Sequence, residues 1–397
     1  MKRLYKPSLG TLSLLCGSCL TLTVASCTSK EPEGNLDLDK VAYKVELPDH
    51  SDSTDIKYSE LFSDVKYIHL DAPCDDAIVG SISKIMITND NELVVLDCGQ
   101  EDKQKIVRFD SEGHFLNKIG ENGHGPNEYT TITNAAYDPF ENQIIVYDWG
   151  SQKYKFYSLE GKMTKSLNVK YTGIFEVLDK DHFIFFDNYA GFNDKDNFVI
   201  TNREGEKVTS FEHIPDASPC DFLGWTRNRM AHTEDGSLLC NGSYSSILFK
   251  VSSGKVQPYI EFIPKTDDWS ISRPEDYKKV KDNCKSYITW FFMHKGKLHI
   301  KANYMGASGQ QFLYITDLHE YTHGGKSFIN DIDQLDWNQN DLAAFHKGKL
   351  YFYAFPESFE WELERDKEYS RLTAENKKLA QECADAVNPT IQICTLK

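Results

Sequence analysis

Residues 106–119 of this 397-residue chain read IVRFDSEGHFLNKI, two short β-forming runs separated by a Ser-Glu-Gly turn at Gly113. A glycine turn between two such runs predicts a pair of antiparallel strands, because glycine supplies the positive φ that a tight turn needs. Similar turns follow at Gly161, Gly205 and Gly254, after intervals of 48, 44 and 49 residues. A four-stranded unit that repeats every 40–50 residues is typical of β-propeller blades.

Six such units follow one another along the chain and predict an all-β fold, a six-bladed β-propeller over residues 41–397. Each unit contains short apolar runs joined by Gly, Asp or Asn turns. The units cover residues 81–119, 135–169, 174–211, 229–262, 288–316 and 342–355.

The two ends of the propeller region predict how the ring closes. Residues 357–387 have helical composition and predict a helix inserted in the last blade, ended by Asn388-Pro389. The terminal run Thr390–Leu396 and the early run Val65–Leu70 alternate as strands, and both would complete the last blade. Closure of this kind removes exposed sheet edges. A further short helix is expected at 272–281, where Ser and Glu are spaced as in a capping box.

The composition favours strands and argues against one class of function. The chain has 21 Tyr and 23 Phe, residue types that are enriched in strands. It carries 60 acidic and 44 basic residues, a formal charge of −16. A nucleic-acid-binding protein needs a basic face, so no nucleic-acid partner is expected.

The first 26 residues predict a secretory signal peptide. Lys2, Arg3 and Lys6 precede an uncharged stretch, residues 8–24, that is short and rich in Ser, Thr and Gly. Val24-Ala25-Ser26-Cys27 then resembles a bacterial lipobox, in which the cysteine is acylated and becomes the first residue of the mature chain. The alternative is an ordinary cleaved signal with an incidental cysteine.

We therefore expect lipidation at Cys27, a polar tether over residues 27–40, and membrane attachment through that lipid. Residue 28 is Thr rather than the Asp of an inner-membrane retention signal, which favours the outer membrane, on its cell-surface or its periplasmic side. Loss of residues 1–26 would remove three basic residues and no acidic one, taking the charge from −16 to −19.

Seven cysteines remain in the mature chain. An odd, scattered set predicts small buried apolar side chains rather than a disulfide framework, although one disulfide stays open. They are Cys74, Cys98, Cys220, Cys240, Cys284, Cys383 and Cys394.

Several stretches near the start of the propeller region resemble a known family. They are ELF at 60–62, VKYIHL at 65–70, IVGSI at 78–82, FDSEGHF at 109–115 and GHGPNEY at 123–129. In these stretches the chain resembles the six-bladed β-propeller lipoproteins of Bacteroides-type bacteria, relatives of NHL-repeat propellers. The resemblance covers most of residues 41–397 and departs from the family pattern at Asn127, where glycine is usual. It implies a propeller fold and an envelope location, and no agreed reaction.

Aromatic and arginine residues near the inter-blade segments predict a surface for recognising a sugar or a peptide. Packing between blades is the alternative, since large aromatic side chains are common there as well. These residues are Trp225, Arg227, Arg229, Trp269, Arg273, Trp290 and Trp337.

No catalytic motif is complete, so no catalytic residue is predicted. The glycines at 120, 123 and 125 do not form the dinucleotide pattern and are interpreted as an inter-blade turn. Six histidines fall near expected blade edges, where propeller enzymes can bind a metal, but no paired spacing requires one. They are His232, His294, His299, His319, His323 and His346. No metal ligand is therefore assigned, and a channel-bound divalent metal stays an option.

These observations predict a ligand- or partner-binding propeller anchored at the cell envelope. The ligand could be a glycan, a peptide or an outer-membrane protein. The alternative is a metal-dependent enzyme of the lyase or lactonase type with its site in the central channel. A third hypothesis is a structural subunit, which would carry a contiguous apolar surface patch.

Overall fold

The computed structural model falls into two units, residues 1–35 and Leu36–Lys397. It describes residues 36–47, 55–99, 103–171, 173–188, 195–214, 229–267, 269–279, 286–304, 311–318, 321–325, 328–335 and 342–397. The expected signal peptide, Cys27 and most of the expected tether lie outside these residues.

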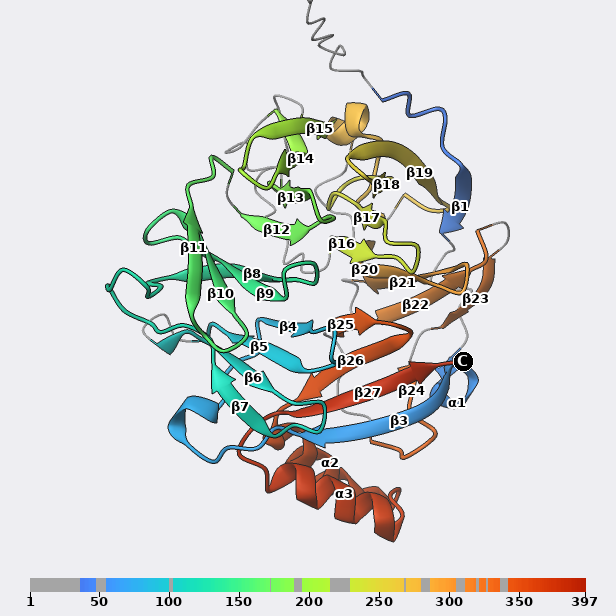
Figure 1. Cartoon of the computed structure of the whole chain (residues 1–397). Coiled ribbons are helices and arrows are strands. Elements are labelled where there is room, and N and C mark those ends of the chain that lie inside the picture. The colour runs from blue at the N-terminus through green and yellow to red at the C-terminus, as the bar shows by residue number, and fades with distance from the viewer. Residues whose placement is uncertain are drawn as a thin grey trace, which may run out of the picture. The chain divides into compact units, whose positions relative to one another are not determined.

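The unit Leu36–Lys397 consists mainly of antiparallel sheets arranged around a common axis, the arrangement of a β-propeller (Figure 1). Neighbouring sheets pack face to face, and the hydrophobic core is divided into clusters along these contacts. The first sheet comprises β4 (Lys84–Ile87), β5 (Leu93–Asp97), β6 (Lys105–Phe109) and β7 (Phe115–Lys118). The second comprises β8 (Ile132–Asp138), β9 (Gln143–Asp148), β10 (Lys153–Ser158) and β11 (Met163–Leu167), and the third β12 (Ile174–Val177), β13 (His182–Phe186), β14 (Asp196–Asn202) and β15 (Lys207–His213).

The remaining sheets continue around the axis. The fourth contains β16 (Met230–His232), β17 (Leu238–Cys240), β18 (Ile247–Ser252) and β19 (Lys255–Pro264). The next contains β20 (Ser286–His294), β21 (Lys297–Tyr304), β22 (Gln311–Thr316) and β23 (Tyr321–Gly325). The last contains β25 (Leu342–His346), β26 (Lys349–Ala354), β27 (Thr390–Leu396) and β3 (Phe62–His69).

The sheets depart from the predicted set of six four-stranded units. In the described residues five sheets have four strands, whereas the sheet of β16–β19 has a fifth strand, β1 (Tyr43–Leu47). β1 runs parallel to β19, with Tyr43 opposite Ile260 and Leu47 opposite Pro264. A separate two-stranded pair joins β2 (Ile56–Lys57) to β24 (Phe328–Ile329). Leu36 and Leu38, in the expected tether, also pack against a core cluster of the propeller.

The predicted ring closure is confirmed. β3 pairs antiparallel with β27, so a strand from near the N-terminus forms the outer edge of the last sheet. Asn388, fully buried just before β27, accepts a hydrogen bond from the Val79 N–H at 2.7 Å and donates to the carbonyl oxygens of Asp71 and Ala77 at 3.0 and 2.8 Å. The side chain thereby joins the end of the chain to the entry of the first sheet.

The turn glycines behave as the repeat predicts. Gly113, Gly161, Gly205 and Gly254 all have positive φ, between 72° and 94°. At Gly161 a Cβ atom would lie 2.7 Å from the carbonyl oxygen of Lys118, so the neighbouring sheet also requires glycine there.

Carboxylates at the ends of second strands fix the entries to two sheets. Asp97, at the end of β5, accepts hydrogen bonds from the N–H groups of Gly80 and Ser81 at 2.7 and 3.1 Å. Asp148, at the end of β9, accepts from the N–H groups of Thr130 and Thr131 at 3.2 and 3.0 Å. The same geometry recurs because each carboxylate satisfies backbone donors that the connection between sheets leaves unpaired.

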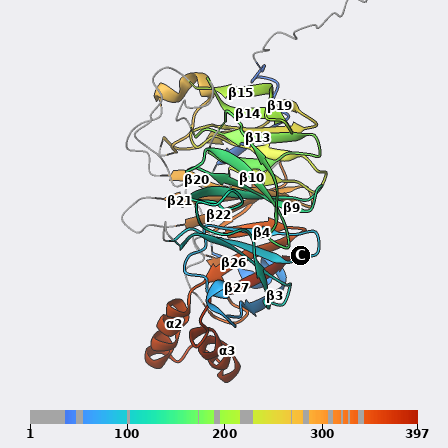
Figure 2. The same ribbon diagram turned by 60° about the vertical axis from the view of Figure 1, so that its left-hand side comes forward.

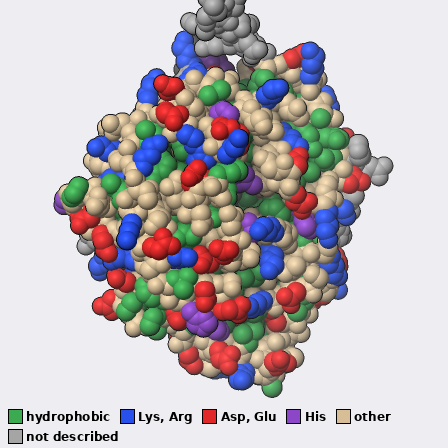
Figure 3. Space-filling model, in the orientation of Figure 1, with side chains coloured by type: hydrophobic (Ala, Val, Ile, Leu, Met, Phe, Trp, Pro, Cys, Tyr) green, Lys and Arg blue, Asp and Glu red, His purple; other side chains and the backbone are tan. Residues whose placement is uncertain are grey.

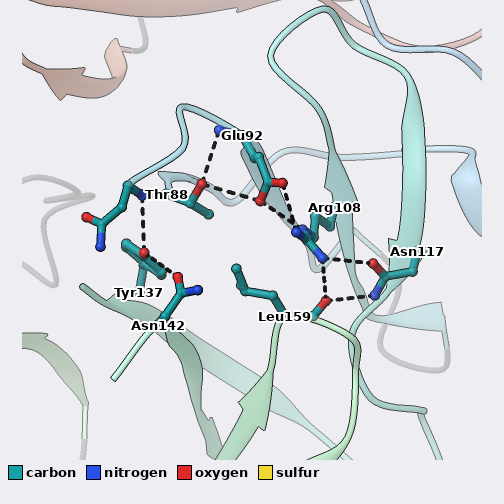
Figure 4. Close-up of polar contacts among 8 residues, drawn as sticks. Thr88, Glu92, Arg108, Asn117, Tyr137, Asn142 and Leu159 are labelled. Carbon is teal, nitrogen blue, oxygen red and sulfur yellow. Dashed lines mark hydrogen bonds and ion pairs between the residues drawn. The ribbon is translucent and has the colours of Figure 1, made fainter. Parts of the chain in front are cut away.

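A polar network links the first two sheets (Figure 4). Two guanidinium nitrogens of Arg108 each lie 2.8 Å from a carboxylate oxygen of Glu92, and a third donates to the carbonyl oxygen of Leu159 at 3.1 Å. Nearby, the Tyr137 hydroxyl donates to Asn142 at 2.7 Å and accepts from the Asn89 N–H at 3.1 Å.

The predicted helix of residues 357–387 is two helices, α2 (Pro356–Tyr369) and α3 (Ala374–Ala384), at the outer side of the last sheet (Figure 2). Ser370 ends α2 in the left-handed conformation, with φ 51°, and the Thr373 hydroxyl caps α3 by accepting from the Asn376 N–H. Helical periodicity predicts that Tyr369 shares a face with Leu372 and Leu379, but at the end of α2 it is 62% exposed.

Two smaller expectations also need correction. The helix expected at 272–281 is a short 3-10 helix, Pro274–Lys279, next to residues outside the described set.

Cys240, Cys383 and Cys394 are buried as predicted, whereas Cys74 is exposed. Besides α2 and α3 there is only α1 (Tyr58–Leu61) among the described α-helices, and none of the three has the length and apolar character needed to cross a membrane.

Candidate functional site

The inner strands of the propeller carry a row of histidines. The strand nearest the common axis in each sheet is β4, β8, β12, β16, β20 or β25. Three neighbouring inner strands, β16, β20 and β25, end in His232, His294 and His346, respectively. Each histidine is followed by the turn into the second strand of its sheet. Figure 3 shows histidine and basic side chains near the centre of the face seen in Figure 1.

Four of the inner-strand side chains form what we call the axial cluster: Lys84, Glu176, His232 and His346. The Lys84 ammonium, on β4, forms an ion pair with the Glu176 carboxylate, on β12. Desolvation lowers the pKa of His232, and the smaller effects of the Glu176 and Lys84 charges raise it and lower it, respectively. His232 is nonetheless exposed.

His346 extends the cluster to β25. Desolvation, followed by smaller effects of the charges of Lys347, His232 and Lys349, lowers the pKa of His346 to about 4. The Nε2 atom of His346 is buried and has no hydrogen-bond partner among the described residues. Lys347 and Lys349 are both exposed, and within the described part of the chain neither forms an ion pair.

A pocket of about 180 Å³ lies between the β16–β17 and β20–β21 turns, and we call it the inter-blade pocket. Lys250 donates to the Asp235 carboxylate at 2.6 Å and lies 5.3 Å from the centre of the Tyr259 ring. His294 Nδ1 lies 2.7 Å from Glu234 Oε1 and so joins the two turns. The lining residues are Thr233, Glu234, Asp235, Leu239, Lys250, Tyr259, Met293, His294, Lys295 and Gly296.

The electrostatics of the inter-blade pocket are balanced. Hydrogen bonds from Lys250, Ser237 and Thr233 hold the pKa of Asp235 below its usual range, so this carboxylate is ionised at neutral pH. Two carboxylates, two ammonium groups and the Tyr259 ring line this pocket. Such a wall offers donors, acceptors and a flat apolar face to one ligand, which suits hydroxyl-rich or peptide ligands.

The predicted aromatic surface does not appear among the described residues. Trp269 and Trp290 are each only 4% exposed and belong to two different core clusters, where Trp290 stacks on Phe292. Arg229 is buried and donates to the carbonyl oxygen of Ile288 at 2.6 Å. Both tryptophans therefore pack in the core between sheets, which was the alternative to a binding surface.

Arg273 binds residues of the chain itself. Its guanidinium lies 2.7 Å from Glu261 and 2.7 Å from Asp39, which attaches the segment before β1 to the fourth sheet. The other predicted binding residues, Trp225, Arg227 and Trp337, lie outside the described residues and stay predictions.

Sequence reasoning noted the histidines but missed Lys84 and Glu176. The available signal was a single charged residue inside an otherwise apolar inner strand, as in Lys84–Ile87 and Ile174–Val177. Within the described ranges, no group of three or more His, Cys, Asp or Glu side chains is placed to hold a metal ion.

The chain matches one protein family and is similar to several solved structures, of which the one with a TM-score of 0.65 supports the propeller fold. The sequence model of a family described as "Domain of unknown function (DUF4934)" matches residues 42–395. A Bacteroides fragilis protein described as exported has a similar structure, with a TM-score of 0.65 and 14% sequence identity. The match covers 89% of this chain and 99% of that one. A DUF4221 family member from Bacteroides vulgatus has a TM-score of 0.48, 11% identity, and coverage of 85% and 97%. Virginiamycin B lyase from Staphylococcus aureus has a TM-score of 0.42, 9% identity, and coverage of 84% and 99%. No curated protein sequence matches the chain.

Proposed function

We propose that this chain, which belongs to the DUF4934 family, is a ligand-binding β-propeller of the bacterial envelope that recognises a glycan or a peptide in the inter-blade pocket. One observation carries the proposal: the 180 Å³ pocket combines the Tyr259 ring with charged donors and acceptors from two neighbouring sheets. Propellers suit recognition because rigid sheets hold the turns that form such a wall.

The location and the finer architecture are part of the same proposal. The lipobox-like Val24–Cys27 supports export and a lipid on Cys27, with the protein held at the outer membrane. We count the five-stranded sheet of β16–β19 and β1 as a blade, which with the five four-stranded sheets makes a six-bladed ring. If the partner is an outer-membrane protein, it would bind the turns of this chain that form the inter-blade pocket.

The test is thermal unfolding of the protein against a panel of neutral glycans and peptides. A ligand at 100 times its Kd stabilises the folded state by about 2.7 kcal/mol. For a unit of roughly 360 residues, with an unfolding entropy of about 2 cal/mol/K per residue, this corresponds to a rise in Tm of about 3–4 °C.

The site is tested with matched variants. Tyr259→Leu and Glu234→Gln remove the ring and one carboxylate from the pocket, and each should weaken a ligand found in the panel at least tenfold. Tyr369→Leu and Glu364→Gln make the same changes at exposed positions of α2 and should leave binding unchanged. Binding that survives both pocket changes would place the ligand elsewhere. A Tm rise with divalent metal that EDTA reverses would instead favour the metal-dependent enzyme.

A further inference from the structure

The charged side chains of the inter-blade pocket differ in how far the chain itself already uses them. The Asp235 carboxylate accepts from the Lys250 ammonium at 2.6 Å and from the Thr233 hydroxyl at 2.5 Å. It also accepts from the Ser237 N–H at 3.0 Å. Lys250 in turn contacts the Tyr259 ring, 5.3 Å from its centre. Asp235 and Lys250 therefore satisfy each other, and a ligand gains little by pairing with either of them.

The other two charged groups, Glu234 and Lys295, keep unused capacity. The Glu234 side chain, in the β16–β17 turn, is 53% exposed, and only its Oε1 atom is engaged, 2.7 Å from His294 Nδ1. Its second oxygen has no partner among the described residues, although a carboxylate can accept several hydrogen bonds. Lys295, in the β20–β21 turn, is exposed and forms no ion pair in the part of the chain that the structure describes. The two turns thus offer the pocket one open carboxylate oxygen and one open ammonium group.

The pocket has room beside these groups, but only for a small ligand. A Cβ atom on Gly296, which lines the pocket next to Lys295, would meet nothing within 4 Å beyond its chain neighbours. The volume of about 180 Å³ is below the range of about 300–1,000 Å³ that is usual for drug-sized ligands. Met293 and Tyr259, both partly buried, add apolar surface to the same lining. Two carboxylates and two ammonium groups cancel in charge, so the pocket favours a ligand that has no net charge.

We propose that the ligand of the inter-blade pocket is a short zwitterion with an apolar side chain, a free amino acid or a dipeptide. This inference rests on the proposed function and names the class of ligand that the same pocket takes. The ammonium group of the ligand pairs with Glu234, and its carboxylate pairs with Lys295. Its side chain packs on Met293 and Tyr259. A neutral sugar carries neither charge and would leave Glu234 and Lys295 without partners.

The experiment is isothermal titration calorimetry of the dialysed protein with leucine and with leucylglycine. At about pH 6.5 an α-amino group is protonated, so both probes are zwitterions. Each is compared with its N-acetylated form, which lacks the ammonium group, and with its C-terminal amide, which lacks the carboxylate. We expect a zwitterion to bind and each blocked form to bind roughly tenfold more weakly or worse, because a charge-assisted hydrogen bond is lost. Tighter binding of leucine indicates a free amino acid, and tighter binding of leucylglycine a dipeptide.

Two variants assign the two ends of the ligand. Glu234→Gln should weaken the zwitterion about tenfold but leave the affinity of the N-acetylated form unchanged, because that form has no ammonium group to lose. Lys295→Asn should weaken the zwitterion but leave the amide unchanged, and asparagine accepts the left-handed backbone of residue 295, with φ 46°. Lys347→Asn is the matched control, since Lys347 also has φ 46° and precedes a glycine but does not line the pocket. It should leave every affinity unchanged.

The outcomes separate this inference from the proposed function. The zwitterion is overturned if neither probe binds, if a blocked form binds as tightly as its parent, or if both variants weaken all forms equally. Binding of doubly blocked N-acetyl-leucinamide or of a neutral glycan, weakened by Tyr259→Leu, would overturn the zwitterion and keep the proposed function. If no glycan, peptide or amino acid responds to Tyr259→Leu, both are overturned.

Discussion

Replacing Asp148 by asparagine tests the role assigned to the carboxylates that end the second strands. The Asp148 side chain is fully buried and accepts from the N–H groups of Thr130 and Thr131 and from the Ser151 hydroxyl at 2.7 Å. The oxygen that binds Ser151 also binds the ammonium of Lys155, at 2.7 Å and with only 7% of that side chain exposed. An asparagine in the same orientation would turn an NH₂ group toward these two donors.

The size of the loss follows from the burial of the pair. Removing one partner of a buried ion pair costs about 3–5 kcal/mol, because the other charge stays buried and unpaired. The carbonyl oxygen of the new asparagine would still accept the backbone N–H bonds, so we expect the lower end, about 3 kcal/mol. For a unit of roughly 360 residues this lowers Tm by about 4 °C.

Asp97→Asn is the matched control. Asp97 occupies the same place at the end of β5 and accepts backbone N–H bonds, but no ammonium group is paired with it in the described structure. Its amide oxygen would still accept from the N–H groups of Ser81 and Gly99, while its NH₂ group would face the Gly80 N–H, so it should lose about 1–2 kcal/mol. Urea unfolding of both variants and of Asp148→Asn/Lys155→Met gives the coupling free energy. Equal losses for the two single variants, or no coupling in the double one, would refute the reasoning.

Acid should reproduce the change. Burial alone would raise the pKa of Asp148, but hydrogen bonds from Lys155, Ser151 and the Thr131 N–H outweigh it and hold the pKa well below its usual range. The stabilisation is therefore complete above the unfolded-state pKa, about 4, and is lost as the pH falls below that value toward the folded-state pKa. As the pH falls from about 5 toward about 2, the wild type should approach the stability of Asp148→Asn, and urea midpoints at each pH measure this convergence.

Three further changes probe other parts of the ring. Asn388→Leu leaves three buried backbone groups without partners at the closure and should cost about 3–5 kcal/mol in urea unfolding; a loss below about 1 kcal/mol would contradict the role given to this side chain. Glu362→Gln weakens the pairing of a fully buried carboxylate with Arg371, at 2.7 Å, and should speed proteolysis within α2 and α3 while the sheet signal in circular dichroism is kept. Gly161→Ala forces a Cβ toward the Lys118 carbonyl at positive φ and should lower Tm by several degrees, whereas an unchanged Tm would mean that the two sheets can move apart.

Local patterns predicted the repeating part of the fold. Gly113 and Gly161 mark turns that require positive φ, and such positions can be recognised from sequence because few residues other than glycine adopt them easily. The pairing of β3 with β27 was also within reach, since two strand-like runs at opposite ends of a propeller have one edge left to share.

Long-range and exceptional features could not be predicted in this way. The parallel pairing of β1 with β19 depends on a partner distant in sequence, and no local signal specifies it. The end of α2 at Ser370 uses a left-handed serine, which composition does not reveal. Trp290 looked like a surface residue because a tryptophan near a strand end can stack on a ligand or on a neighbouring sheet, and only its 4% exposure decides between the two.

The pairing of β3 with β27 also imposes an order on biosynthesis. β3 leaves the ribosome early, yet its partner comprises Thr390–Leu396 near the end of the sequence, so the last sheet cannot form until that strand has been made and delivered. Until then, β3 presents an unpaired edge that can recruit strands from other chains. The nascent chain therefore needs protection from aggregation until β27 has been made and paired. Loss of the β27 strand would leave an open ring that is prone to aggregation, not merely a slightly shorter protein.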